Sequence, residues 1–445
     1  MTDQSFEKKD IVFFLILFMA IIIFSGAWYY PFEGFTTSIE EPDAPLAVPF
    51  RYLFWGVVVF MSGIHFNRFG YAPYFVALAP FLPLIIVALF ATLLGIFPLF
   101  SLKTVVFMLC MITAGIILPL EARPKFLFTS TFYILGLLLI LSVAFCILVP
   151  SIAIQGTDGR TSWRGLFVFK QAYGWVSAIT FVLGYGLRSH ILKSALIPIL
   201  IVAAISMVFS DNKGAAITAV VACGYCFLVE KLNSTGLEFG QKLFTAIFAI
   251  VLFVFAAVFA VEPLLELLGR DATLTGRTVI WSRFYSLVLP YWAIGAGPSS
   301  FTTPTELTVG IAADFIEFGA ITQPHNTYIA VFGETGILGF ISYVGLLVYL
   351  IFIRPFYSAS IYAVVCSALG VLVAIDSFVE THSPLNYTLE WFLLTALYTA
   401  SLRREGLEKL VEATRISVRE EVLPLRQKGA FARKRDMGDS LHNSL

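Results

Sequence analysis

The side chains best suited to chemistry lie in a polar stretch between residues 262 and 334, which is flanked on both sides by long apolar segments. This stretch contains Arg277 and His325. The guanidinium of an arginine is a planar fork of donors that fits a phosphate group and stays charged. An imidazole has an ordinary pKa of about 6.5, so it can accept a proton near neutral pH. These two residue types predict a site that binds an anion and removes a proton.

Further basic side chains lie in the same stretch and in two other loops. They are Arg164, Lys170, Lys213 and Arg270. Lys213 is the most informative, because apolar segments closely flank the short turn from Ser210 to Gly214, and a lysine so near hydrocarbon is costly without a partner. Two interpretations stay open. The cations converge on an anionic ligand, or they form ion pairs with nearby carboxylates, such as Lys213 with Asp211.

The composition indicates an integral membrane protein. The chain is 58% hydrophobic and only 13% charged, and a water-soluble fold with so few charges would expose large apolar patches. Uncharged runs that can form helical spans recur along the chain. They lie at about 11–30, 52–66, 74–98, 104–120, 127–149, 171–187, 194–210, 214–229, 243–261, 335–353, 357–375 and 386–401. We therefore predict an all-α fold: a polytopic membrane protein with about twelve transmembrane helices and one long periplasmic loop that contains short helices.

The positions of lysine and arginine set the predicted orientation. Connections rich in these residues alternate with acidic or neutral ones, and the positive-inside rule then places both termini in the cytoplasm. This organisation has nine spans within residues 1–261, a periplasmic loop at 262–334, three spans within 335–401 and a basic cytoplasmic tail at 402–445. The candidate cations then lie on the outer side, where a lipid phosphate or diphosphate is the ligand that their position suggests.

The local sequence predicts how the two main candidates are positioned. His325 follows Pro324, so we expect it in the first turn of a helix, whose N-terminus would favour the neutral imidazole. Arg277 begins an amphipathic segment that can lie on the membrane surface.

Other ionisable residues have less direct predicted roles. Glu334 is nine residues from His325, which is about 900° on an unbroken helix and places the two on opposite faces. Only a break near Gly333 would let Glu334 orient the imidazole, so we expect it to pack or to end a helix. His65 and His382 are expected to be structural. Glu390, near the outer end of the last span, is placed to contact a cationic partner.

Several short motifs follow one another in an order that carries a family resemblance. They are Trp163-Arg164-Gly165-Leu166-Phe167 with Lys170, the turn from Ser210 to Gly214, Thr275-Gly276-Arg277-Thr278 with Trp281, Gly295-x-Gly297 with Phe301, and His325-Asn326-x-Tyr328 followed by Glu334-x-Gly336. This succession resembles the O-antigen ligase and polysaccharide polymerase superfamily over roughly residues 80–400. It looks closest to the exopolysaccharide polymerase branch of that superfamily.

The resemblance implies an inverting, metal-independent glycosyl transfer from an undecaprenyl diphosphate-linked glycan, without a cofactor, on the periplasmic face of the bacterial inner membrane. By motif match, His325 would be the base, and Arg277 and Lys213 would hold the diphosphate. The ligase pattern usually has an arginine at the position of Lys213, which favours the polymerase branch. The remaining candidates are Arg164, Lys170 and Arg270 as further diphosphate ligands, and Tyr328 and Glu334 as supporting residues.

The expected partners are the lipid-linked oligosaccharide donor, a glycan acceptor, membrane lipid, and other polysaccharide assembly and chain-length proteins, but no nucleic acid. An O-antigen ligase that transfers the glycan to lipid A–core is the nearest alternative. A lipid-linked sugar transporter is less consistent with the sequence, because it should place cations along a central path between repeated halves. A nucleotide-sugar glycosyltransferase would need a cytosolic domain with an Asp-x-Asp metal pair or a glycine-rich phosphate loop, and the sequence has neither.

Overall fold

The computed structural model describes residues 8–27, 47–157, 160–252, 277–314, 321, 323–386 and 388–403. Within these ranges the regular structure is almost entirely helical, and its one sheet is an antiparallel pair of short strands, β1 (Ile154–Thr157) and β2 (Arg160–Trp163). The helices before the sheet are α1 (Lys8–Ser25), α3 (Ala47–Phe69), α4 (Ala72–Leu78), α5 (Leu82–Leu94), α6 (Pro98–Glu121), α7 (Pro124–Leu148) and α8 (Pro150–Ala153). Those after it are α9 (Lys170–Gly186), α10 (Lys193–Phe209), α11 (Lys213–Asn233), α13 (Arg277–Val288), α14 (Glu306–Asp314), α15 (Thr327–Val348), α16 (Arg354–Tyr357), α17 (Ile361–Asp376) and α18 (Leu389–Leu402).

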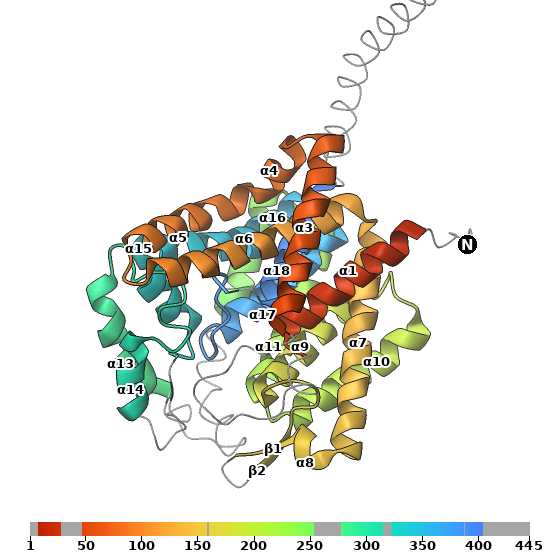
Figure 1. Cartoon of the computed structure of the whole chain (residues 1–445). Coiled ribbons are helices and arrows are strands. Elements are labelled where there is room, and N and C mark those ends of the chain that lie inside the picture. The colour runs from red at the N-terminus through yellow and green to blue at the C-terminus, as the bar shows by residue number, and fades with distance from the viewer. Residues whose placement is uncertain are drawn as a thin grey trace, which may run out of the picture.

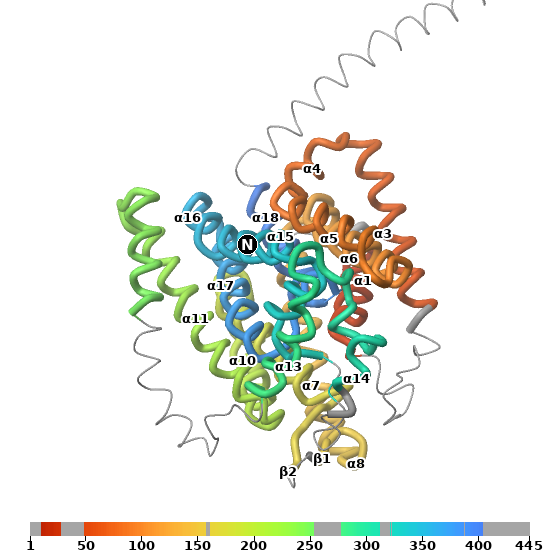
Figure 2. Tube along the Cα trace, turned by 90° about the vertical axis from the view of Figure 1, so that its left-hand side faces the viewer, coloured from red at the N-terminus to blue at the C-terminus, as the bar shows by residue number. Residues whose placement is uncertain are grey.

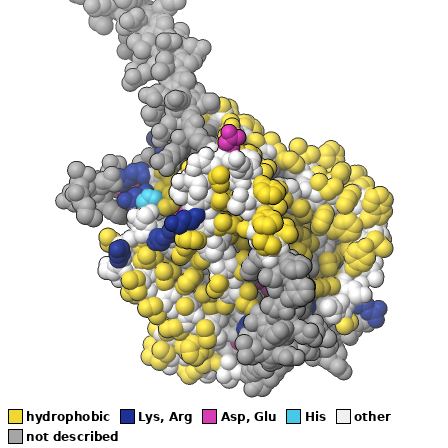
Figure 3. Space-filling model, turned by 180° about the vertical axis from the view of Figure 1, so that it is seen from behind, with side chains coloured by type: hydrophobic (Ala, Val, Ile, Leu, Met, Phe, Trp, Pro, Cys, Tyr) yellow, Lys and Arg dark blue, Asp and Glu magenta, His cyan; other side chains and the backbone are white. Residues whose placement is uncertain are grey.

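Ten apolar helices within the described residues identify an all-α membrane protein, as the sequence predicts. Five of them, counted among the described residues, are long and apolar enough to cross a membrane: Ala72–Leu94, Pro98–Glu121, Pro124–Leu148, Lys213–Asn233 and Thr327–Tyr357. Shorter apolar helices occupy Asp10–Ser25, Lys193–Phe209, Phe239–Leu252, Ile361–Asp376 and Leu389–Leu402. Large apolar side chains also cover much of the outer surface, as one face shows in Figure 3. The number of twelve spans and the orientation remain predictions.

The centre of the bundle is formed by α17 and α18, which lie among the other helices in Figure 1. Every described residue of α18 from Leu389 to Ser401 is buried, and α18 packs against α6 while α17 packs against α9, α11 and α18. Because α17 carries Asp376 and α18 carries Glu390, this enclosure by protein keeps two ionisable side chains away from lipid. The connection between α17 and α18, residues 377–388, therefore starts and ends on the two most enclosed helices.

The polar stretch identified from the sequence folds partly into helices. Its described part contains α13 and α14, which lie together at one side of the molecule in Figure 1 and face the viewer in Figure 2. The apolar side of α13 does not lie outward on a membrane surface as expected. Ile280 and Phe284 are buried against Ile311 of α14 and Ile329 of α15, while Val279 is exposed. The amphipathic pattern of α13 thus reflects packing within the protein.

The helix α15 is broken at Gly336, where φ is 67° and ψ is −169°. The carbonyl oxygens of Gly333 and Glu334 accept hydrogen bonds of 2.8 and 3.0 Å from backbone N–H groups of the segment 292–297, which we call the strap. The N–H of Ile337 in turn donates to a strap carbonyl at 2.7 Å. Since hydrocarbon offers no hydrogen-bond partners, a break within an apolar helix is stable only when other protein groups satisfy its backbone in this way.

The strap passes close to two helices. Gly295 in the strap has a φ of 90°, and a Cβ there would lie 2.3 Å from the carbonyl oxygen of Glu334. On the other side, the N–H of Ile96, just after α5, donates to the carbonyl of Ala296 at 2.9 Å. Glycine at position 295 is thus required by both backbone conformation and space.

Substitution at the break tests the role of this backbone exchange. A Cβ at Gly336 would lie 2.5 Å from the carbonyl oxygen of Ala293, and its backbone conformation is one that only glycine adopts readily. We expect Gly336→Ala to reduce the free energy of unfolding by about 2 kcal/mol or more, measured as a lower midpoint of thermal unfolding in detergent. Gly345→Ala in the same helix is the matched control, because no atom lies within 4 Å of a Cβ there. Equal midpoints for the two variants would contradict this account of the break.

Candidate active site

Glu380 joins the two residues that the sequence singles out. Its Oε1 accepts a hydrogen bond from Nη2 of Arg277 at 2.7 Å, and its Oε2 lies 3.0 Å from Nδ1 of His325. Arg277 is the first residue of α13, His325 immediately precedes the N-cap of α15, and Glu380 belongs to the connection 377–388. Three segments that are far apart in the sequence therefore meet at one carboxylate.

His325 lies before α15 and not in its first turn, so the expectation drawn from the preceding proline was wrong. The helix begins at Thr327, and the side-chain oxygen of Asn326 caps it by accepting a hydrogen bond from the N–H of Ile329. The φ of His325 is 46°, in the left-handed region that is unfavourable for a residue with a Cβ. Such a conformation persists only where the surrounding structure holds it.

Hydrogen bonds to the connection 377–388 hold the start of α15 in place. Thr327 donates from its N–H to the carbonyl of Ser377 at 2.8 Å and from its hydroxyl to the carbonyl of Glu380 at 3.1 Å. The side chain of Asn326 donates to the carbonyl of Phe378 at 3.1 Å. Because these bonds come from the two residues that follow His325, they fix the imidazole beside Glu380.

The contact with Glu380 determines which nitrogen of His325 can act as a base. An ionised carboxylate only accepts hydrogen bonds, so Nδ1 of His325 donates its hydrogen to Glu380. In the neutral imidazole the lone pair is then on Nε2. No hydrogen bond to Nε2 is formed by any residue that the structure describes, and the side chain is 26% exposed. The arrangement presents a base with a defined tautomer.

The surroundings of Glu380 keep it ionised. Burial would by itself raise the pKa of this carboxyl, but its hydrogen bonds and electrostatic interactions with His325 and Arg277 outweigh burial and lower the pKa to about 2. Glu380 uses only one nitrogen of the Arg277 fork. The other, Nη1, is buried and has no hydrogen-bond partner among the described residues. Arg277 therefore has donor capacity left for another acceptor.

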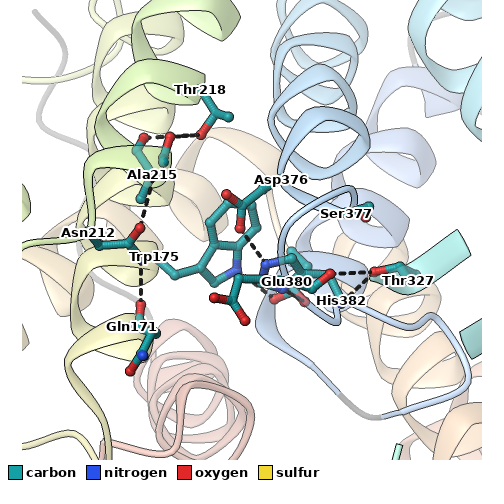
Figure 4. Close-up of polar contacts among 12 residues, drawn as sticks. Gln171, Trp175, Asn212, Ala215, Thr218, Thr327, Asp376, Ser377, Glu380 and His382 are labelled. Carbon is teal, nitrogen blue, oxygen red and sulfur yellow. Dashed lines mark hydrogen bonds and ion pairs between the residues drawn. The ribbon is translucent and has the colours of Figure 1, made fainter. Parts of the chain in front are cut away.

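A second cluster of ionisable groups lies next to the first, around His382 (Figure 4). Nε2 of His382 lies 2.7 Å from Oδ2 of Asp376, at the end of α17, and its Nδ1 lies 3.2 Å from Oε1 of Glu390, at the start of α18. The ring stacks on Trp175 of α9 with 4.0 Å between centroids, and Nε1 of Trp175 donates to Oε2 of Glu390 at 3.2 Å. His382 is thus the cationic partner that the position of Glu390 suggests.

Two other candidate cations lie around the turn that precedes α11. Lys213 is the first residue of that helix, and a Cβ on Gly214 would lie 3.5 Å from Oδ1 of Asp376, so the turn is close to the end of α17. Asp211, considered as a partner for Lys213, lies 3.9 Å from Nζ of Lys170. Lys170 thus reaches the same turn from the start of α9, and the role of both lysines in binding diphosphate stays a prediction.

Arg164 and Arg270 are not placed at Glu380 by any described contact. Arg164 is buried, and its Nε and Nη2 both donate to the carbonyl of Ile152, at 2.8 and 2.6 Å. These bonds tie the end of β2 to the residues just before β1. Arg270 lies outside the described residues. Both remain predicted ligands only.

The two residues predicted to support the site have structural contacts. Glu334 is fully buried at the break in α15, where its Oε1 accepts hydrogen bonds from the hydroxyl of Thr302 at 2.8 Å and the N–H of Phe301 at 3.3 Å. Tyr328 donates from its hydroxyl to the carbonyl of Ala374, near the end of α17, at 2.8 Å. Glu334 thus fixes α15 to the segment before α14, and Tyr328 fixes the start of α15 to α17.

Neither Glu380 nor Asp376 is among the site residues that the sequence predicts. A signal for them was present, because the connection 377–388 and its flanks contain several acidic residues and a histidine between two apolar helices. Ionisable residues in such positions usually have a partner and a function. The sequence could not tell that Glu380 faces His325, which is 55 residues away.

Comparison with known proteins connects this geometry to a family. Residues 198–344 match the family model described as O-antigen ligase. This match supports the superfamily that the sequence motifs predicted and does not specify the exopolysaccharide branch. The matched segment covers less than half of the chain and includes Lys213, Arg277 and His325, and it points to glycan transfer in polysaccharide assembly. The match does not separate polymerases from ligases. No curated protein matches the chain.

The lowered pKa of Glu380 leads to a test by pH. With a pKa of about 2 in the folded state and about 4.3 in the unfolded state, Glu380 binds fewer protons in the folded protein within that interval. Its stabilising contribution is therefore fully present above about pH 4.3 and is lost as the pH falls toward 2. We expect the wild type to have a higher midpoint of thermal unfolding than Glu380→Gln at pH 5, and this difference to shrink below about pH 4.3. A difference that grows on acidification would contradict the assignment.

Proposed function

We propose that this protein is a membrane glycosyltransferase that moves a glycan from undecaprenyl diphosphate to a sugar hydroxyl of an acceptor, on the periplasmic face of the bacterial inner membrane. The reaction inverts the anomeric centre, needs no metal ion and polymerises repeat units of exopolysaccharide or O-antigen. The observation that carries this proposal is the bridge by which Glu380 joins Arg277 and His325, within a chain that matches the O-antigen ligase family.

The chemistry of the transfer fits these groups. The acceptor oxygen attacks the anomeric carbon, the bond from that carbon to the diphosphate oxygen breaks, and the diphosphate leaves with the bonding electrons. Nε2 of His325 takes the proton of the acceptor hydroxyl, while Glu380 stabilises the imidazolium that forms. The negative charge on the leaving diphosphate requires preorganised cations, and Arg277 has one nitrogen without a described partner. Lys213 and Lys170 are the further cations that we assign to the diphosphate.

Glu380 and Arg277 have complementary parts in this scheme. The carboxylate neutralises part of the arginine charge and limits its movement, so that the guanidinium fork is oriented before the donor arrives. The same carboxylate sets the imidazole tautomer. Glu380 thereby links Arg277, which binds the leaving diphosphate, to His325, which removes the proton.

The first experiment measures transfer in vitro from a purified lipid-diphosphate oligosaccharide in the presence of a chelator. We expect His325→Ala and Arg277→Ala each to reduce the rate by about 100-fold or more. Glu380→Gln should cause a loss of similar size, because its amide can donate to Nδ1 and favour the wrong tautomer.

The control for this experiment is Arg188→Ala. Arg188 also forms a two-pronged ion pair with a glutamate, Glu230, but it lies between α9 and α10 and has no part in the proposed reaction. Its variant should retain nearly the wild-type rate. Full activity of both His325→Ala and Arg277→Ala would rule out the mechanism.

A ligase is the second candidate, favoured by the description of the matched family. The acceptor distinguishes the two activities. A polymerase extends the glycan when only the lipid-linked donor is supplied, so we expect a ladder of products on a gel without any other acceptor. A single product that forms only after lipid A–core is added would identify a ligase instead.

A further inference from the structure

The cluster around His382 combines burial, charge and connectivity in a way that the proposed reaction does not use. Both ring nitrogens face carboxylates, Asp376 and Glu390, whose side chains are only 2% and 3% exposed. Because an ionised carboxylate can only accept, both nitrogens must donate, and the imidazole therefore carries a positive charge. Burial alone would lower the pKa of His382, but the hydrogen bonds and charges of the two carboxylates raise it. His382 therefore has no lone pair with which to act as a base.

The backbone of His382 is held as firmly as its ring. Its N–H donates to the hydroxyl of Thr327 at 2.7 Å, and its carbonyl accepts from Nε1 of Trp391 at 2.8 Å. The hydroxyl of Thr327 at the same time donates to the carbonyl of Glu380 at 3.1 Å. One buried hydroxyl thus links the backbone of His382 to the backbone of Glu380, as Figure 4 shows.

Four elements converge on His382: three contact its imidazole and one contacts its backbone N–H. Asp376 ends α17, Glu390 lies in the first turn of α18, Trp175 lies on α9, and Thr327 begins α15. These elements flank the connection that carries Glu380. Breaking a buried charge network of this kind by removing one member is costly, because the remaining charges lose their compensation. The imidazole of His382 is therefore suited to fix the relative positions of the elements that contact it.

We propose that His382 is a positioning residue for the transfer: clamped between Asp376 and Glu390, it fixes the backbone of the connection 377–388 so that Glu380 meets both His325 and Arg277. This inference rests on the proposed function for its consequence in catalysis. The structural part of the inference, that His382 fixes the connection 377–388, applies to the protein without substrate. His382 itself touches neither donor nor acceptor in this scheme.

A double-mutant cycle of His382→Gln with Glu380→Gln tests the catalytic part. We expect His382→Gln to lower kcat about 10- to 100-fold, with the KM for the lipid-diphosphate donor within about twofold of the wild type. If His382 acts through Glu380, adding His382→Gln to Glu380→Gln causes no further loss. Losses that multiply in the double variant would overturn the proposal.

The variant His382→Gln leaves two buried carboxylates without their cation and can fail to fold. A second variant therefore tests the same link without changing any charge. Thr327→Val keeps the size of the side chain and all the charges, but removes the hydroxyl that links Glu380 to His382. It should also lower kcat with little change in KM, and an unchanged kcat would count against the proposal. The matched control is His65→Gln, which breaks another buried histidine–glutamate contact, at 2.7 Å from Glu121, and should leave kcat unchanged.

Hydrogen exchange of the substrate-free protein separates this inference from the proposed function. We expect peptides that cover residues 377–388 to exchange faster in His382→Gln than in the wild type or His65→Gln. Unchanged exchange in those peptides would overturn the proposal even if the protein is an active transferase. A wild type that transfers nothing from the lipid-diphosphate donor would instead count against the proposed function, while faster exchange would still support the positioning role.

Discussion

The site depends on one constraint: a largely enclosed carboxylate stays ionised only when donors surround it. Glu380 has its donors in Arg277 and His325, which approach its two oxygens from different segments. Removing either donor would leave the carboxylate with one hydrogen bond fewer, and removing the carboxylate would leave the arginine without its anion. The packing of α13 and the start of α15 against the connection 377–388 can be understood as the structure that brings these charges together.

The same principle operates two residues further along the connection, with the signs reversed. Around His382 a single cation lies between two carboxylates, and Thr327 connects this cluster to the backbone of Glu380. Polar networks in a low-dielectric environment become more rigid as their members are satisfied, and both oxygens of Glu380 and both ring nitrogens of His382 have partners. Two networks that share a backbone segment can therefore hold a loop between buried helices as firmly as apolar packing holds the helices.

The sequence was informative about class and about single residues, but less so about pairings. Apolar runs such as 127–149 closely match helices such as Pro124–Leu148, because hydrocarbon selects for apolar length regardless of the neighbours. Arg277 and His325 could be recognised by side-chain chemistry alone. Glu380 could not be assigned to them, because its partners lie 103 and 55 residues away. The helix α15 was also misjudged at both its start and its break, since a glycine in an apolar run does not reveal whether the helix passes through it.

The strap has a consequence for the order in which this protein can assemble. The helix α15 lacks a complete backbone ladder of its own, and residues 292–297 provide the missing donors and acceptor. A ribosome delivers the strap before it delivers α15, since synthesis runs from the N-terminus. The strap must therefore be in place when α15 packs against its neighbouring helices, because unpaired backbone groups at the break would have a high free-energy cost in lipid. Insertion of this helix is accordingly a cooperative event that includes the strap, and not the independent partitioning of a self-sufficient span.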